Sequence, residues 1–320
     1  MDLSLDPATW RRGGCKVAPV FFRTLPPVNC KLPTEMPFLA DYHVHLEKGP
    51  YTPDWLGRFV TVARQRGLVE LGFTEHLCDF YEGQEASGAW WAGAPEGEDR
   101  AYSRRWWQGR PRYSLDEYVA LVKDAHPAGI TLRLGVEVDY FPSAETSLRR
   151  LLAAYPFDLV LGSVHWLDGW GFDHLDRLER WQDRDVDMVY RRYFAELGRA
   201  AHSGLFDVLA HVDLIKVAGY RPSFDPTPLY AEAARAIAAA GVAVEVSTAG
   251  LRKPVHEIYP AEPFLRLLGE HGVPITLASD AHTPEDVGRD FDAAVDLARR
   301  CGYERVCRFS RRVRTQVLLS

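Results

Sequence analysis

The 320-residue chain has little cysteine, no long apolar run and no excess of basic residues. Its five cysteines form no Cys-x-x-Cys pair and their number is odd, which favours free thiols in a reducing, cytoplasmic compartment. No segment approaches the roughly 18 consecutive apolar residues of a transmembrane helix, so we expect no membrane partner. The net charge of −6 provides no basic surface for nucleic acid, and we expect no nucleic-acid partner.

The first part of the chain differs in composition from the rest. Residues 1–37 are rich in Pro, Arg and Gly without a sustained hydrophobic period, so we interpret them as an irregular leader. They contain no apolar stretch typical of a signal peptide. Met36 precedes the first convincing strand, and we expect it to lie close to the natural start, with a dispensable leader. Residues 38–320 are then expected to form one domain, because 47% of the chain is apolar and 26% is charged.

Apolar strands alternate with helices along this domain. Strands are predicted over residues 38–45, 69–73, 130–138, 157–164, 206–210, 242–246 and 273–278, with a short one over 305–309. Helices are predicted over 55–66, 114–128, 143–154, 186–202, 228–240, 263–271 and 284–300. This alternation predicts parallel βαβ units in a doubly wound sheet or a barrel. Two polar segments, about 79–113 and 166–185, are predicted as loops, and their tryptophans fit either a lid or ordinary surface packing.

Residues that can bind metal ions follow nearly all of these strands. They are His43, His45, His76, Glu137, His165, His211, Asp280 and His282. Each one alone fits a capping or core role better, and Glu137 could simply pair with Arg133. Their recurrence favours one shared metal site. Only a closed barrel brings so many strand ends to one mouth, so the sequence predicts an α/β barrel.

The types of these residues indicate which ions they would bind. Imidazole and carboxylate groups suit Zn, Mn or Fe, and eight candidates exceed the needs of one ion. A carboxylate such as Glu137 can bridge two ions about 3.5–4 Å apart, which is the geometry that clamps attacking and leaving oxygens during displacement at phosphorus. The sequence therefore predicts more than one divalent ion and chemistry at a phosphate.

Six motifs, each after a strand, carry a family resemblance. They are Asp-Tyr-His-Val-His (41–45), Gly-Phe-Thr-Glu-His (72–76), Gly-Val-Glu-Val-Asp-Tyr (135–140), Gly-Ser-Val-His (162–165), Ala-His-Val-Asp-Leu-Ile-Lys (210–216) and Ser-Asp-Ala-His (279–282). In this order, from residue 40 to about 310, the chain resembles the polymerase-and-histidinol-phosphatase (PHP) superfamily, and within it the monofunctional histidinol-phosphate phosphatases. The resemblance implies a single distorted (β/α)7, TIM-like barrel with two to three divalent ions.

The resemblance also assigns the ligands. One ion would be held by His43, His45, Glu137 and Asp280. Glu137 would bridge to a second ion, held also by His165 and His211, while His76 and His282 would hold a third. Many relatives complete the third site with a histidine at the position of Tyr51. Here Glu47 or Tyr51 would replace it, and Glu47 is the better ligand for a hard divalent ion.

The implied reaction is metal-assisted hydrolysis of L-histidinol phosphate, a small phosphate monoester of histidine biosynthesis. A metal-activated water would attack phosphorus in line, with Asp280 handling the proton and with Glu137 and His282 beside it in the catalytic set. Arg252 is predicted to bind the phosphate, because guanidinium groups suit bidentate contacts. Lys253 and Lys216 are further candidates.

Several points stay open at this level. Candidates for reading the imidazole and amine of the substrate are Trp166, Trp170, Asp168 and Glu257, without a ranking. An alternative function is a PHP phosphoesterase for another small phosphate, such as a nucleotide or sugar phosphate. A non-catalytic PHP module of a larger assembly is a further alternative, which the retained ligands disfavour. The oligomeric state cannot be predicted.

Overall fold

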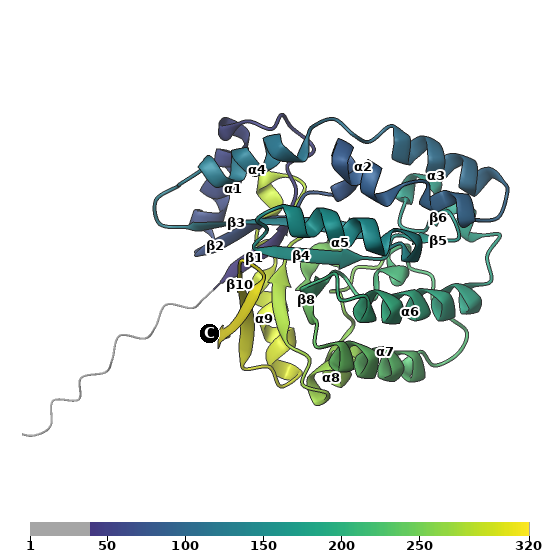
Figure 1. Cartoon of the computed structure of the whole chain (residues 1–320). Coiled ribbons are helices and arrows are strands. Elements are labelled where there is room, and N and C mark those ends of the chain that lie inside the picture. Colours follow the sequence, from purple (N-terminus) through teal and green to yellow (C-terminus); the bar gives the residue numbers. More distant parts are fainter. Residues whose placement is uncertain (1–38, 320) are drawn as a thin grey trace, which may run out of the picture. The chain divides into compact units, whose positions relative to one another are not determined.

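Seven parallel strands form the central sheet of the computed structural model, which describes residues 39–319. Their order is β1 (Ala40–Val44), β2 (Glu70–Phe73), β3 (Thr131–Asp139), β4 (Leu159–Ser163), β7 (Val208–Leu209), β8 (Ala243–Ser247) and β9 (Ile275–Ala278). The sheet curls into a nearly closed barrel (Figure 1), which confirms the predicted fold class. The predicted leader, residues 1–37 with Met36, lies outside the described residues, so its separation from the domain stays a prediction.

The first and last strands of the barrel are joined without a regular ladder. The backbone N–H of His45 donates to the carbonyl of Ala281 at 2.8 Å, and a parallel bridge pairs Val44 with Ala281. Further down, the buried carboxylate of Asp41 accepts hydrogen bonds from the backbone and hydroxyl of Ser279 and from the backbone of Gly288. A side chain therefore does here what backbone hydrogen bonds do between the other strands.

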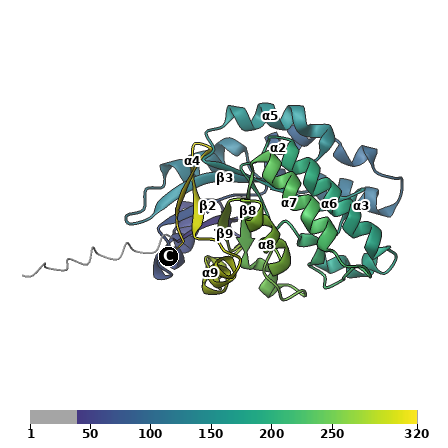
Figure 2. The ribbon, with the colours of Figure 1, turned by 90° about the horizontal axis from the view of Figure 1, so that it is seen from below.

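A helix follows each strand and covers the outside of the barrel, as Figures 1 and 2 show. These helices are α1 (Pro53–Gln65), α4 (Leu115–Asp124), α5 (Glu145–Ala154), α6 (Val186–His202), α7 (Thr227–Ala240), α8 (Glu262–Glu270) and α9 (Phe291–Arg300). Local sequence sets several ends. Ser114 and Glu117 form a capping box at the start of α4, and Gly241 adopts a left-handed φ of 69° after α7. No helix within residues 39–319 has the length and apolar character needed to span a membrane.

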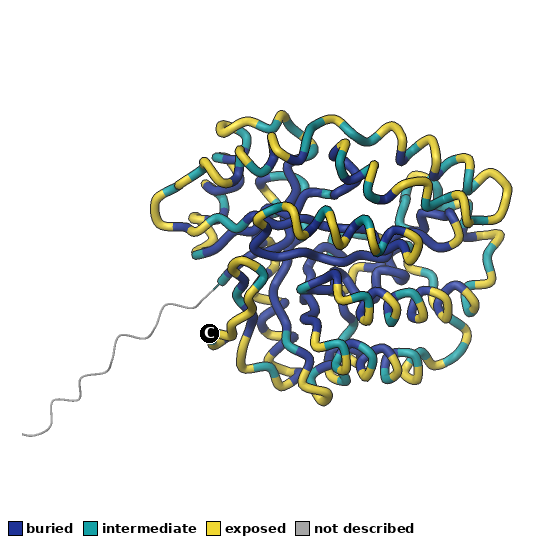
Figure 3. The backbone as a smooth tube through the Cα atoms, in the orientation of Figure 1, coloured by how far each residue is buried: buried dark blue, intermediate teal, exposed yellow. Residues whose placement is uncertain are grey.

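Two hydrophobic clusters hold these layers together. The larger one lies between the strands and the helices, whose buried faces alternate with exposed ones in Figure 3. The smaller one fills the barrel interior with side chains such as Tyr42 and Leu161. A hairpin of β10 (Arg305–Ser310) and β11 (Val313–Leu318) closes the amino-terminal end, where Phe309 packs edge-on against Tyr42 at 5.7 Å. The opposite, carboxyl-terminal mouth stays available for a site.

The prediction of a loop over 79–113 is wrong, because most of this segment is helical. It contains α2 (Tyr81–Ser87) and α3 (Glu98–Gln108). The helices are stabilised by packing rather than by periodicity: Trp90 stacks on Phe141 at 4.1 Å, and Trp107 is buried. The second insertion carries the short strands β5 (Trp166–Leu167) and β6 (Trp170–Gly171).

The predicted helix at 284–300 is also wrong in one respect. A left-handed residue, Asp290 with φ 60°, separates α9 from a 3-10 turn. Such turns recur across the described chain, at Leu77–Asp79, Trp90–Gly93, Pro142–Ala144, Leu175–Trp181, Leu214–Lys216, Thr248–Arg252 and Pro284–Asp286. Most of these turns follow a strand and change the direction of the chain at the mouth of the barrel.

Candidate metal centre

Glu137, at the mouth of the barrel on β3, is the hub of the predicted ligand set. Its Oε2 lies 2.9 Å from Nδ1 of His76 and 3.3 Å from Nε2 of His43. Its Oε1 lies 3.2 Å from Nε2 of His211 and 3.6 Å from Nε2 of His165. One carboxylate thus faces two separate groups of imidazoles with its two oxygens, as a bridging ligand would.

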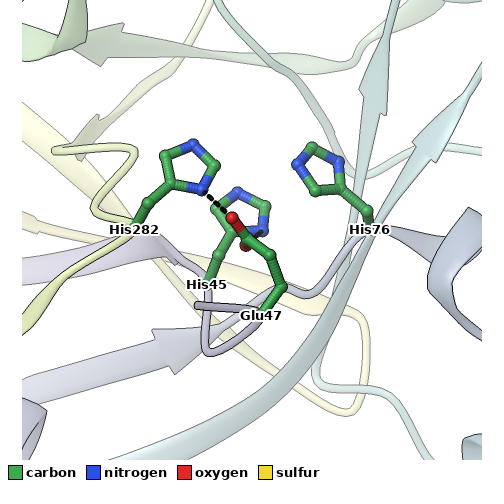
Figure 4. A group of neighbouring side chains, drawn as sticks. All are labelled: His45, Glu47, His76 and His282. Carbon is green, nitrogen blue, oxygen red and sulfur yellow. Dashed lines mark hydrogen bonds and ion pairs between the residues drawn. The ribbon is translucent and has the colours of Figure 1, made fainter. Parts of the chain in front are cut away.

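All eight strand-end residues and Glu47 come together in this region. Three groups have ligand atoms within 4.8 Å of one another: His45, Glu47, His76 and His282; His43, Glu137 and His211; and His43, His45 and Asp280. Figure 4 shows the first group, in which the carboxylate of Glu47 is 2.9 Å from Nδ1 of His282. Tyr51 is outside it, because its hydroxyl donates to Glu75 at 2.6 Å. The geometry thus favours Glu47 over Tyr51.

A second layer of carboxylates orients these imidazoles. Glu245, fully buried on β8, accepts from Nδ1 of His43 and from the backbone N–H of His211, both at 2.9 Å. Asp139 lies 2.8 Å from Nδ1 of His165. Such contacts leave the other ring nitrogen free to bind an ion. Sequence reasoning missed both residues, although Glu245 lies inside a predicted strand and Asp139 directly follows one.

The electrostatics of the cluster are dominated by its own members. Burial would lower the pKa of His43, but the carboxylates of Glu245, Glu137 and Asp280 outweigh burial and raise it. Burial and the neighbouring imidazoles lower the pKa of His45 to about 3. For Asp280, burial opposes ionisation, yet the surrounding imidazoles hold its pKa well below the usual range. The cluster thus raises the pKa of one imidazole, lowers that of its neighbour and keeps the carboxylate of Asp280 ionised.

The orphaned atoms test whether a metal fits. Buried Nε2 of His43, both ring nitrogens of His45 and Oε2 of Glu137 have no hydrogen-bond partner among the described residues. Buried polar atoms are normally paired, and these point at one another instead. Nitrogen and carboxylate oxygen donors without sulfur suit a divalent ion such as Zn. The residues therefore fit the predicted group.

A cavity of about 380 Å³ opens above the cluster. Its floor includes candidate ligands, and the two insertions add Tyr102 and Trp106 from the first and Trp166, Asp173 and His174 from the second. The insertions contact each other, because the rings of Trp106 and Trp166 lie 5.2 Å apart. Of the unranked candidates for substrate reading, Trp166 lines the cavity, whereas Trp170, Asp168 and Glu257 do not.

The predicted phosphate-binding residues are placed differently from one another. Lys253 lines the cavity, and among the described residues its ammonium has no ion-pair or hydrogen-bond partner. Arg252 does not line it, since its guanidinium donates to the carbonyl of Ser279 at 2.6 Å. Lys216 is buried and paired with Asp213 at 2.8 Å. The three assignments stay predictions, and this geometry favours Lys253. Arg110, a cavity cation that sequence reasoning missed, is paired with Asp79.

The parallel barrel with a histidine and carboxylate cluster at its mouth defines the class of this protein. Residues 41–249 match the PHP domain, and the chain belongs to the PHP family. A curated relative, the probable histidinol-phosphatase of Deinococcus radiodurans, is 34% identical over 271 residues, covering 82% of this chain and 94% of the relative.

Two solved structures share the fold. The putative histidinol phosphatase of Listeria monocytogenes has a TM-score of 0.63 at 19% identity and covers 79% of this chain and 99% of its own. The histidinol phosphate phosphatase of Lactococcus lactis subsp. lactis, complexed with zinc, L-histidinol and phosphate, has a TM-score of 0.59 at 21% identity, covering 87% and 98%. At these identities the two likenesses support the fold alone.

Proposed function

We propose that this protein is a metal-dependent phosphomonoesterase that hydrolyses L-histidinol phosphate to L-histidinol and phosphate. The observation that carries the proposal is the set of unpaired, buried nitrogen and oxygen atoms around Glu137, which fits divalent ions. The 34% identity to a probable histidinol-phosphatase supports the substrate. That reaction would place the protein in histidine biosynthesis, in the cytoplasm.

The proposed ligands follow the three groups of atoms, except that His165, 3.6 Å from Glu137, takes the place of His43 in the second. His43, His45 and Asp280 form one corner, and Glu137 with His165 and His211 forms the second. Glu47, His76 and His282, with His45 between them, form the third. We propose that this arrangement holds two to three divalent ions. Zinc is favoured because the Lactococcus lactis structure contains it, with Mn and Fe as alternatives of similar ligand preference.

Divalent ions bound here would stabilise charge on the phosphoryl oxygens and lower the pKa of a hydrolytic water. The chain's own residues would do the rest. Lys253 would contact the phosphate from the cavity wall. Asp280, whose Oδ1 lies 3.2 Å from Nε2 of His282, would accept the proton from the attacking water. Arg252 would hold the backbone beside Asp280 through its hydrogen bond to Ser279.

The test is phosphate release by metal-stripped protein reloaded with Zn or Mn. L-histidinol phosphate is compared with nucleotide and sugar phosphates, and the Asp280→Asn variant is assayed alongside. We expect metal-dependent turnover that prefers L-histidinol phosphate and collapses in the variant. Equal turnover of the other phosphates would refute L-histidinol phosphate as the specific substrate. No turnover by metal-loaded protein would refute the phosphatase proposal.

A further inference from the structure

Two carboxylates in the cavity wall, Asp173 and the exposed Asp176, are used neither by the ligand set nor by its second layer, and Asp173 is the more buried of the two. Asp173 follows β6 in the second insertion and lines the cavity. Its Oδ1 is buried without a hydrogen-bond partner, and no Lys or Arg of residues 39–319 forms an ion pair with it. Burying a carboxylate that has neither a hydrogen-bond donor nor a cation beside it costs free energy. In a cleft, such a carboxylate is a candidate for binding a ligand.

Aromatic rings surround the same part of the cavity. Trp166 lies 4.9 Å from His174 between ring centroids, and the hydroxyl of Tyr102 is 2.8 Å from Nδ1 of His174. Adding a Cβ at Gly171 would overlap the His174 ring, so this position keeps the ring close to the backbone. Flat aromatic walls beside an uncompensated carboxylate suit a ligand that carries both a ring and a positive charge.

The basic residues of the cavity carry the charge that would attract a phosphate. Only Arg110 and Lys253 supply Lys or Arg side chains to the cavity among the described residues. Arg110 is neutralised by Asp79, with Nη2 at 2.9 Å from Oδ2. Lys253 and the ions would attract phosphate, whereas Asp173 would repel it. The cavity thus carries a cation that suits an anionic group and a carboxylate that suits a cationic group of one molecule.

We propose that Asp173 binds the ammonium group of the substrate and so selects amine-bearing phosphate monoesters over those without an amine. This inference rests on the proposed phosphatase function. A different role would be support of His165, because the charges of Asp139 and Asp173 both raise the pKa of that histidine against the effect of burial. The two roles differ in whether the amine of the substrate matters.

The experiment compares two substrates in the Asp173→Asn variant. L-histidinol phosphate has the amine, and 3-(imidazol-4-yl)propyl phosphate lacks it. We expect kcat/KM for L-histidinol phosphate to fall by about 30-fold, mostly through KM, because a charge-assisted contact is lost. For the deamino ester we expect a change of less than about threefold. The control is Asp183→Asn in the same insertion, which is surface-exposed and lies 3.9 Å from Arg180, and should affect neither ester.

Each other outcome is decisive. An equal loss for both esters would assign Asp173 to support of the metal centre, and no loss for either would also overturn the proposal. If the wild type hydrolyses neither ester, the proposed function fails, and calorimetric binding then decides on Asp173. In that case the variant should bind L-histidinol about 30-fold more weakly and inorganic phosphate as before. Unchanged L-histidinol binding would refute the inference.

Discussion

Replacing Glu245 by Gln tests whether the second layer of carboxylates prepares the metal centre. Glu245 accepts two hydrogen bonds, one with each oxygen, from His43 and from the backbone of His211. A Gln side chain has one oxygen, so its amide must face one of these donors. If the oxygen stays with His211, the amide donates to Nδ1 of His43 and the ring proton moves to Nε2. That nitrogen then has no lone pair for an ion.

The expected magnitude follows from this tautomer change. Loss of an outer-layer partner typically lowers metal affinity by about 10- to 100-fold, which corresponds to about 1.4–2.8 kcal/mol. The metal-free protein should also lose about 1–3 kcal/mol of unfolding free energy, because hydrogen bonds to a buried carboxylate are replaced by weaker ones to a neutral amide. The assay is chelator competition for Zn, combined with thermal or denaturant unfolding of the stripped protein.

A matched control separates the two effects. Glu70 is equally buried but lies at the amino-terminal end of the barrel, where it pairs with Arg133 at 2.7 Å. Glu70→Gln should destabilise the fold and leave Zn affinity within about twofold. Wild-type Zn affinity in Glu245→Gln, or an equal loss of affinity in Glu70→Gln, would refute the reasoning.

Three further outcomes are expected. Glu47→Gln should lower the metal content by about one ion per chain in mass spectrometry, while Tyr51→Phe should not; equal contents would exclude Glu47 as a ligand. Burial opposes the ionisation of Glu70, but its arginine and tyrosine partners outweigh burial and lower its pKa below 4.5. The stability advantage of wild type over Glu70→Gln should thus be full above pH 4.5 and shrink as pH falls further, as acid titration of unfolding would reveal. Gly83→Ala should cost more than about 2 kcal/mol, because its Cβ would overlap a backbone carbonyl, whereas Gly57→Ala in open space on α1 should be neutral or stabilising in denaturant unfolding.

The barrel and the positions of the ligands could be predicted from the sequence because both depend on local patterns. Apolar strands that recur at regular intervals can be recognised in the sequence, and a histidine directly after such a strand must lie at the barrel mouth. The second layer was not readable in the same way. A glutamate such as Glu245 inside a strand differs from a surface residue only through its tertiary contacts with His43 and His211.

The insertions and the cations show the same limit. Residues 79–113 were predicted as a loop, because their helices are short and depend on Trp90 and Trp107 packing against other segments. The direction of Arg252 depends on the 3-10 turn Thr248–Arg252, which turns its guanidinium toward the carbonyl of Ser279. Adjacent Lys253 faces the cavity instead. Sequence alone cannot decide between two neighbouring cations in a turn.

The contact between Asp41 and Ser279 has a consequence for how the protein acquires its site. The two residues are 238 positions apart, and the barrel closes only when they meet. Contacts across so long a stretch form slowly, because the chain loses conformational entropy before the stabilising contacts form. During synthesis, a nascent chain that has not reached His282 holds only part of the ligand set. Metal loading should therefore follow completion and closure of the chain, so that incomplete barrels carry no full centre.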